Sequence, residues 1–500
     1  MERIKIGWAK REISADWKMA IPGQMYIRVA EGVMDPLYAT ALVMDNGEDQ
    51  VIFCTCDVVV LRGGVIRMTR EKVKEKNPGI PVEKIIMGAT HTHSGGNLND
   101  GPTKTPDGVE LVGGKEYREF FSERAAEAIV EAWETRAPGG FAYGYGYAVV
   151  AHSRRVIYSE DMSVRNPSAV APNGFGVMYG NTNDPAFSHY EAGADHYLNA
   201  LYTFDENDRL TGMIVNVPCP SQLSEHFTRF SSDFWNEVRE GVKKEYGENV
   251  FVLPQCAAAG DLSPRTLHYK EAQARRMTLK YDLPYDLKKA KRGTVDAYNK
   301  TMSERYDIAE RILDAVREVY SWAKKEIFKE VPLQHVTETV DLERRVITEE
   351  EKEWCENNIK DMEGKIPDQG TPEEIRIAVS RYNSVKGRNT RAIERCEDVK
   401  IHPTLPMELH VLHVGDVAFS TCRFELFMDF MHRIQARSPF LQTFLIQLAG
   451  EEGGNYLATE RAKKSKGYSA SLFDNMVSPN GGQQLVEETL RVLNQFKEQA

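Results

Sequence analysis

Apolar residues recur with two different periods along the chain, and these periods predict alternating strands and helices. Buried strands are predicted at 38–44, 51–60, 84–89, 141–150, 196–204, 210–217 and 249–253. Helices are predicted at 65–76, 116–136 and 232–245. Asn46-Gly47 between the first two strands is a hairpin signal, and Asp205 to Asp208 form a second turn of this kind. The alternation of strands and helices predicts an α/β fold.

The second half of the chain has a different pattern. Residues 266–400 are charged and mostly of helical character, with a clear helix at 306–320, so we expect a helical subregion within one domain that spans residues 1–500. Strands are predicted again at 408–420 and 443–448, and a closing helix at 484–500. Residues 157–195 are rich in Asn, Pro, Gly and Ser and predict a long loop, which at that length is either functional or mobile.

Charge and cysteine usage exclude several classes of partner. The formal net charge is −11 and no long basic run is present, which argues against nucleic acid and anionic membranes. The first ten residues contain no signal-like apolar region, and no run approaches the ~18–20 apolar residues of a membrane span. The seven cysteines are scattered and odd in number, which indicates reduced thiols. We therefore expect a cytoplasmic protein that acts on a small molecule without stable membrane insertion.

The stretch Thr90-His91-Thr92-His93-Ser94-Gly95-Gly96 is the strongest candidate for chemistry. It follows the predicted strand 84–89, and alternation along an extended backbone would point both imidazoles to the same side. Glycines allow the backbone to turn close to a ligand, and neutral imidazole is a common zinc ligand. The alternative is that one histidine is a hydrogen-bonded core residue and the other caps a loop.

Polar residues at the end of strand 51–60 add a second candidate. Cys54 and Cys56 can bind a soft metal, although two cysteines in a buried strand are more often small core residues. Asp57 follows them at the end of an apolar strand, where a carboxylate requires a partner. A histidine of a nearby metal site would supply that partner.

Four segments at predicted strand ends carry unusual residues: the Thr90–Gly96 stretch, the segment around Cys219, Gly260-Asp261-Leu262-Ser263-Pro264-Arg265, and Arg423-Phe424-Glu425-Leu426 followed by Asn455-Tyr456. Together they resemble the neutral/alkaline non-lysosomal ceramidase family. The opening residues 6–13 and Asp35-Pro36-Leu37 are also similar to the family. The resemblance extends in order from residue 4 to about residue 475. It implies the layered mixed sheets and flanking helices of a ceramidase catalytic domain.

The resemblance implies a zinc site held by two histidines, a glutamate and a tyrosine. The first histidine matches His91, the glutamate Glu425 and the tyrosine Tyr456. The position of the second family histidine matches Cys219, which departs from the family; cysteine thiolate is itself a zinc ligand. His226 is the alternative fourth ligand.

The resemblance also implies the groups that handle the substrate. His93 matches the residue that polarises the substrate or transfers a proton, and Ser263 the serine at the reacting centre, with Asp261 beside it in the motif. Arg154 matches the family arginine, with Arg155 as its competitor. Tyr468, twelve residues after Tyr456, matches a further family tyrosine.

The implied activity is zinc-dependent hydrolysis of an amide (N-acyl) bond by a metal-activated water. The chain differs from ceramidases in having no export signal and no immunoglobulin-like C-terminal domain, so we expect a small polar or amphiphilic substrate in place of ceramide. A lactone, an ester or a sugar derivative is an alternative substrate on the same scaffold. A non-catalytic metal-binding or ligand-binding relative is an alternative of a different class.

Overall fold

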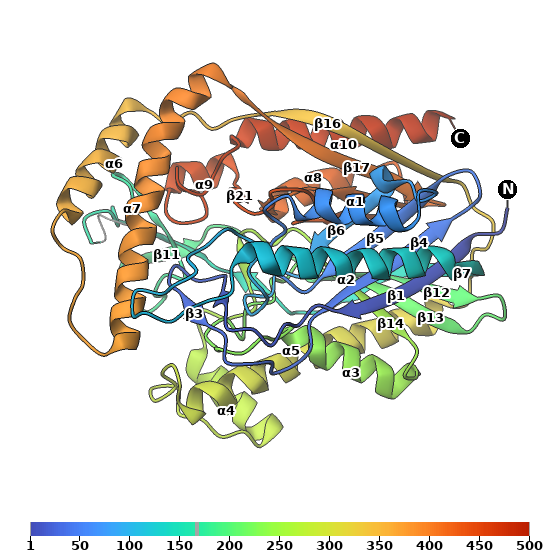
Figure 1. Cartoon of the computed structure of the whole chain (residues 1–500), viewed down its shortest axis with the longest axis horizontal. Helices are drawn as coiled ribbons and strands as arrows, with labels where there is room; N and C mark the ends of the chain where they lie inside the picture. The colour runs from blue at the N-terminus through green and yellow to red at the C-terminus, as the bar shows by residue number, and fades with distance from the viewer. Residues whose placement is uncertain (1, 166–169, 500) are drawn as a thin grey trace.

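Two β-sheets that pack face to face form the centre of the molecule (Figure 1). The computed structural model describes residues 2–165 and 170–499. The larger sheet has eight strands, in the spatial order β14 (Phe251–Cys256), β13 (Leu210–Val217), β12 (Tyr197–Asp205), β7 (Ala137–Tyr147), β1 (Lys5–Glu12), β4 (Tyr38–Asp45), β5 (Gln50–Cys56) and β6 (Ile85–Ala89). The smaller sheet has four, in the order β16 (Leu333–Glu343), β17 (Thr404–Val414), β18 (Val417–Thr421) and β20 (Gln442–Ile446).

Both sheets are mixed. In the larger sheet β5 and β6 run parallel, as do β13 and β14, while the other neighbours are antiparallel. The loops that follow β6 and β13 nevertheless meet. The Ser221 hydroxyl donates to the Thr90 carbonyl at 2.9 Å, and the His93 amide donates to the Ser221 carbonyl at 3.1 Å.

Strand β4 shows why the strands of the larger sheet are apolar at almost every position. Leu42 and Met44 belong to the core that the sheet shares with Phe419 of the smaller sheet. Ala41 and Val43, which alternate with them, point to the opposite face and pack with helices. A strand that is buried on both faces has a continuous apolar run and no polar alternation.

Helices cover both outer faces and complete a four-layer arrangement. Gly7 on β1 permits the close approach of one of them, because a Cβ atom there would lie 1.9 Å from the carbonyl oxygen of Ala132. The helices on the outer face of the larger sheet are α1 (Val65–Lys76), α2 (Gly114–Glu134), α3 (Phe234–Tyr246) and α5 (Val295–Ala323), and those on the outer face of the smaller sheet are α8 (Met428–Arg437) and α10 (Pro479–Gln499).

Helices α6 (Glu349–Met362) and α7 (Pro372–Ile401) pack together at one end of the molecule (Figure 1). Each begins at a threonine whose hydroxyl accepts a hydrogen bond from the N3 amide, while the N3 glutamate accepts one from the threonine amide. These capping boxes satisfy amides that the first helical turn leaves free. Two shorter helices are α4 (Lys270–Tyr281) and α9 (Glu460–Ser465).

The structure confirms the α/β class, the 38–60 and 196–217 hairpins and the helices α1, α2 and α3. Three predictions were wrong in detail. Residues 408–420 form two strands that meet at Gly415. The predicted long loop contains a three-stranded sheet, and the predicted helical subregion contains β16. The strands of that small sheet are β9 (Arg155–Tyr158), β10 (Gly176–Met178) and β11 (Phe187–Tyr190).

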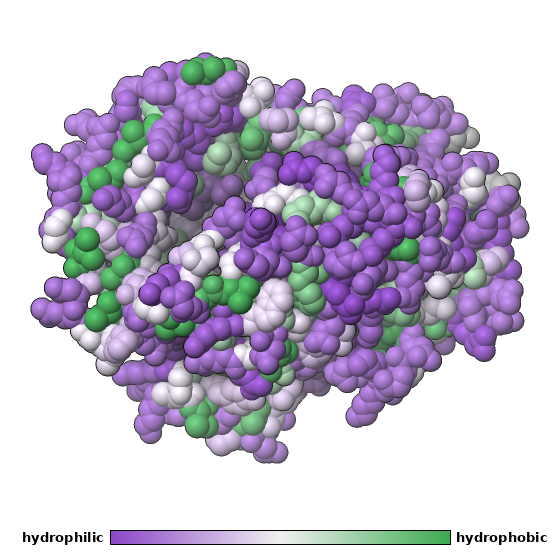
Figure 2. Space-filling model, in the orientation of Figure 1, coloured by the Kyte–Doolittle hydropathy of each residue, from purple (hydrophilic) through white to green (hydrophobic). Residues whose placement is uncertain are grey.

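The face of the molecule in Figure 2 is mainly hydrophilic, with apolar side chains scattered over it. None of the helices in the described part of the chain combines the length and apolar character that spanning a bilayer requires. The extent of the chain as a single domain stays a prediction.

Candidate active site

The two histidines of the Thr90–Gly96 stretch lie next to each other beyond the end of β6. His91 adopts a left-handed backbone conformation with φ of 62°, which is uncommon for a residue other than glycine. The imidazole rings are 4.9 Å apart and nearly perpendicular, with the two Nε2 atoms 3.4 Å apart. The expectation of an extended backbone here was wrong, since β6 ends at Ala89 and the turn at His91 brings the rings together.

A polar group lies near the Nδ1 atom of each of these imidazoles. The Nδ1 of His91 lies 2.7 Å from the carbonyl oxygen of Val59, so it donates there and leaves the Nε2 lone pair free. The Nδ1 of His93 lies 3.3 Å from the Glu225 carboxylate. Burial lowers the pKa of His93 despite the opposing charge of Glu225, which favours the neutral imidazole. Two electron-rich Nε2 atoms therefore face each other.

Glu425 and Tyr456 reach the same place from two short strands. Strands β19 (Glu425–Leu426) and β21 (Tyr456–Leu457) pair in parallel and set these two residues side by side. Glu425 Oε2 lies 3.3 Å from His91 Nε2. Burial opposes ionisation of Glu425, but its interactions with His91 and the charge of Arg154 outweigh it and lower its pKa to about 2. Glu425 is therefore an ionised, buried carboxylate next to His91 Nε2.

Arg154 contacts these groups, whereas the guanidinium of Arg155 pairs with a different carboxylate. An Nη atom of Arg154 lies 3.6 Å from Glu425 Oε2 and 3.4 Å from the Tyr456 hydroxyl, and it donates to the Gly260 carbonyl at 2.8 Å. Arg155 forms a buried ion pair with Glu191 at 2.6 Å. The arginine at the candidate site is therefore Arg154.

Tyr468 and Ser263 lie at the edge of this cluster. The Tyr468 ring packs edge-on against Tyr456 with ring centroids 5.6 Å apart. Ser263 lies on β15 (Leu262–Ser263), which pairs with β8 (His152–Ser153). Its hydroxyl is 3.4 Å from the Gln222 amide nitrogen, and that nitrogen lies 2.5 Å from the Tyr179 hydroxyl.

Asp261 stabilises the loop in which it lies through hydrogen bonds to backbone amides, and its carboxylate does not join the cluster. Its carboxylate accepts a hydrogen bond from the Met428 amide at 3.1 Å at the start of α8, and its carbonyl accepts one from the Arg154 amide. Burial is the largest influence on its pKa and raises it to about 6. Asp261 thus fixes the segment that carries Arg154 and Ser263.

Cys219 does not point toward the cluster. Its thiol donates to the Val150 carbonyl, with Sγ 3.3 Å from that oxygen, and burial raises its pKa well above the ordinary value. His226 lies 3.4 Å from the Tyr26 hydroxyl and 3.9 Å from Glu225. Within residues 2–165 and 170–499, no hydrogen bond or ion pair joins either residue to His91 or Glu425.

The sequence reasoning missed Glu225, Arg265, Gln222 and Tyr179. Arg265 follows the Gly260–Pro264 motif directly, and its guanidinium pairs with the Glu225 carboxylate that contacts His93. That charge, together with His93, outweighs burial and lowers the pKa of Glu225 far below its usual range. For Gln222, Glu225 and Arg265, proximity to the Cys219 and Gly260 segments in the sequence was the available signal, whereas Tyr179 lies in the predicted long loop and had none.

The spacing of the donors is compatible with a metal ion. Two ligands of a tetrahedral zinc, bonded at about 2.0–2.1 Å, lie about 3.4 Å apart, and His91 Nε2 lies 3.3 Å from Glu425 Oε2. Among the described His, Cys, Asp and Glu side chains, the group whose ligand atoms all lie within 4.8 Å of one another is a different one: Glu349, Cys396 and Glu397.

The predicted set therefore has two parts. His91, His93, Glu425, Tyr456 and Arg154 form one connected cluster, with Tyr468 and Ser263 at its edge. The side chains of Cys219 and Asp261 are hydrogen-bonded to backbone groups outside the cluster, and Arg155 pairs with Glu191 and, among these cluster residues, contacts the backbone carbonyl of Tyr468.

Comparison with solved structures finds two ceramidases over nearly the whole chain. Neutral ceramidase from Pseudomonas aeruginosa superposes with a TM-score of 0.64 at 15% sequence identity, covering 99% of this chain and 75% of that one. A ceramidase complexed with C2 gives a TM-score of 0.65 at 14% identity, covering 100% of this chain and 76% of that one. No family model matches the sequence. No curated protein matches it either. The fold of the chain is that of the neutral ceramidases, as its sequence motifs predict.

Proposed function

We propose that the protein is a metal-dependent hydrolase that cleaves an amide bond of a small polar or amphiphilic substrate. The observation that carries this proposal is the meeting of His91 Nε2, Glu425 and Tyr456 with the guanidinium of Arg154. The ceramidase-like fold and the spacing of these donors support it.

We assign His91, Glu425 and Tyr456 as the protein ligands of a zinc ion. The hydrogen bond from His91 Nδ1 to Val59 orients the free Nε2 lone pair, an arrangement that is typical of metal-binding histidines. The thiol of Cys219 is directed at a backbone carbonyl, so we place it outside the ligand set. A zinc ion at this place supplies a bound water of lowered pKa and polarises a carbonyl group.

The residues around the ligands handle protons and charge. Glu225 holds the Nδ1 proton of His93, so the Nε2 atom is free to accept a proton and pass it to the leaving amine. Arg154 places a donor where negative charge develops on the carbonyl oxygen. Ser263, tied through Gln222 to Tyr179, offers a further hydroxyl at the edge of the cluster.

Metal analysis together with turnover tests this assignment. Purified protein is expected to carry about one zinc ion per chain, and His91→Ala and Glu425→Ala should lose the metal and, with it, part of the stability. His93→Ala and Ser263→Ala should keep the metal but lose about a hundredfold or more of turnover. Full metal retention in both ligand variants would contradict the assigned site.

Cys219→Ser provides the matched control for the ligand set. Cobalt-substituted protein should lack the intense near-ultraviolet band of thiolate ligation, and the variant should bind the metal as the parent does. An intense band that disappears in Cys219→Ser would instead make this cysteine a ligand. A panel of chromogenic amides, esters and lactones identifies the bond that is cleaved, and bound metal without turnover on any of them would favour a non-catalytic binding protein.

A further inference from the structure

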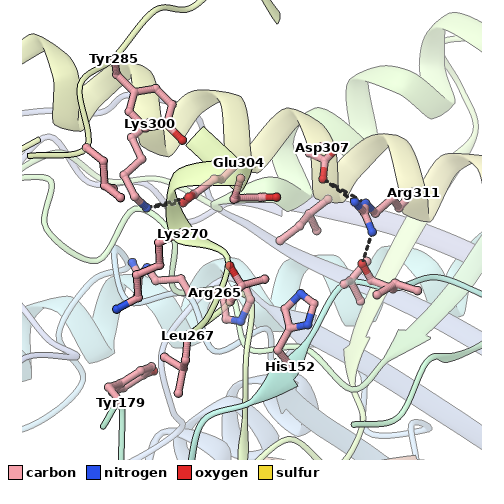
Figure 3. A pocket seen from close by; sticks show the side chains of 17 residues that line it. His152, Tyr179, Arg265, Leu267, Lys270, Tyr285, Lys300, Glu304, Asp307 and Arg311 are labelled. Carbon is pink, nitrogen blue, oxygen red and sulfur yellow. Dashed lines mark hydrogen bonds and ion pairs between the residues drawn. The ribbon is translucent and has the colours of Figure 1, made fainter. Parts of the chain in front are cut away.

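A cavity of about 350 Å³ opens beside the candidate active site, between β8, the segment that follows Ser263, and α5. Its volume is at the lower end of the range for small-molecule sites. Figure 3 shows Tyr179 and Leu267 on one side of it and residues of α5 on the other, with His152 between them. Apolar and charged side chains occur on both sides of the cavity.

Two walls of the cavity are built from residues that contact the candidate site. The Tyr179 hydroxyl lies 3.3 Å from an Nη atom of Arg154. The guanidinium of Arg265 pairs with the carboxylate that lies 3.3 Å from His93. His152 is the cross-strand neighbour of Ser263, and such neighbours point to the same face of a sheet. The cavity therefore adjoins the cluster.

The charged residues of the lining leave a positive surplus. Four cationic side chains face two carboxylates, and both carboxylates are already paired. Glu304 accepts from Lys300 through both oxygens at 2.7 Å. Asp307 is in contact with three cations, namely Arg276, Lys280 and Arg311. An anionic ligand would meet a net positive environment.

Lys270 and His152 are lining residues whose side-chain hydrogen-bond donors are available to a ligand. Within residues 2–165 and 170–499, neither side chain forms a hydrogen bond or an ion pair, and the side chain of Lys270 is exposed. Burial, followed by the charges of His196 and Arg311, lowers the pKa of His152 to about 4, so its imidazole is neutral near pH 7 and donates one N–H. A cation and a neutral donor face the same cavity (Figure 3).

We propose that this cavity is the subsite for an anionic group, a carboxylate on a short apolar arm, so that the enzyme hydrolyses acidic amides such as N-acyl amino acids. The apolar residues Val150, Leu267 and Ile308 contact the arm, and Lys270 with His152 binds the carboxylate. This inference rests on the proposed hydrolase function.

Matched substrates test the subsite. Succinyl-p-nitroanilide and N-acetyl-4-aminobenzoate carry the carboxylate on the acyl and amine sides of the amide, and each is compared with its neutral carboxamide and with a trimethylammonium analogue. The parent should prefer one carboxylate substrate about tenfold or more in kcat/KM. The ratio should fall toward one in Lys270→Glu, recover in Lys270→Arg, and stay unchanged in Lys360→Glu, a control on the surface of α6. A higher kcat/KM for a phosphonate analogue than for the carboxylate substrate would show that the subsite prefers a phosphate-like group, and it would overturn the choice of a carboxylate.

Calorimetric titration separates this inference from the proposed function. Succinanilate and its neutral diamide are titrated into the parent and Lys270→Glu. Selective binding of succinanilate without any turnover would support the subsite and defeat the hydrolase. Equal turnover of acidic and neutral substrates, or a preference for trimethylammonium, would overturn the subsite and leave the hydrolase intact. The absence of both turnover and selective binding would defeat both.

Discussion

Gly23→Ala is expected to lower turnover by displacing the His93 side chain, although His93 itself is not substituted. Gly23 has φ of +97°, and a Cβ atom there would lie 2.7 Å from Cγ of the His93 ring and 2.8 Å from its Nδ1. Ordinary contact begins at 3.4 Å, so the ring must move by about 0.7 Å. Because a misplacement of about 1 Å can cost about a hundredfold in rate, turnover should fall about ten- to a hundredfold.

Gly32→Ala is the matched control for the backbone. Gly32 has φ of +112°, and its nearest neighbour would be Asp16 Oδ1 at 3.8 Å. Both variants should lose a similar free energy of unfolding, about 1–3 kcal/mol, because an L-residue is strained at either φ. Only Gly23→Ala should also displace the imidazole.

The assay combines three measurements on the parent and both variants. Urea unfolding compares stability, hydrolysis of the best chromogenic amide compares turnover, and nitrogen-15 spectra of the histidine side chains report the position of His93. Gly32→Ala should keep the parent turnover and the parent imidazole signal of His93. If that signal moves in Gly23→Ala while turnover stays at the parent level, His93 does not act at the reacting centre.

Two further predictions concern buried charge. Burial, followed by the charges of His410 and Lys84, holds the pKa of His335 well below its usual range. As the pH falls, the unfolded chain binds a proton at this residue that the folded chain does not, so the free energy of unfolding should fall between pH 7.5 and 5.0 by up to about 2 kcal/mol. Urea unfolding of His335→Asn should show a weaker dependence on pH than that of the parent. Equal slopes for parent and variant would refute this. Arg239→Met should cost about 3–5 kcal/mol by leaving Asp57 buried and unpaired, and Asp57→Asn in the same chain should restore part of that loss; no recovery in the double variant would contradict the pairing.

Local patterns were sufficient for much of the fold. The hairpin β4–β5 and the strand β6 are short apolar segments whose lengths and turn residues are specific to strands. Strand β16 was missed because its buried positions, Leu333, His335, Val340 and Leu342, do not alternate cleanly and lie in a charged stretch. Its structure depends on pairing with β17 along eleven residues, which is tertiary information.

Long-range pairing explains the errors at the strand ends. Asp57 was expected to pair with a histidine of the metal site, but its carboxylate lies 2.7 Å from the guanidinium of Arg239, 182 positions later in the chain. Cys54 and Cys56 are core residues packed against the helices, which is the commoner alternative for such a pair. Sequence alone shows that a buried carboxylate needs a partner and cannot show which cation the fold brings to it.

The position of Cys219 illustrates the same limit for the candidate site. Matching motifs in order places it where the related family has a histidine, yet its thiol donates to the Val150 carbonyl and its burial raises the pKa of the thiol. The left-handed turn at His91 instead brings His93 within 3.4 Å of the proposed ligand. A donor set of His91, Glu425 and Tyr456 leaves a fourth position for water or substrate, which is the arrangement of a catalytic metal site rather than a closed structural one.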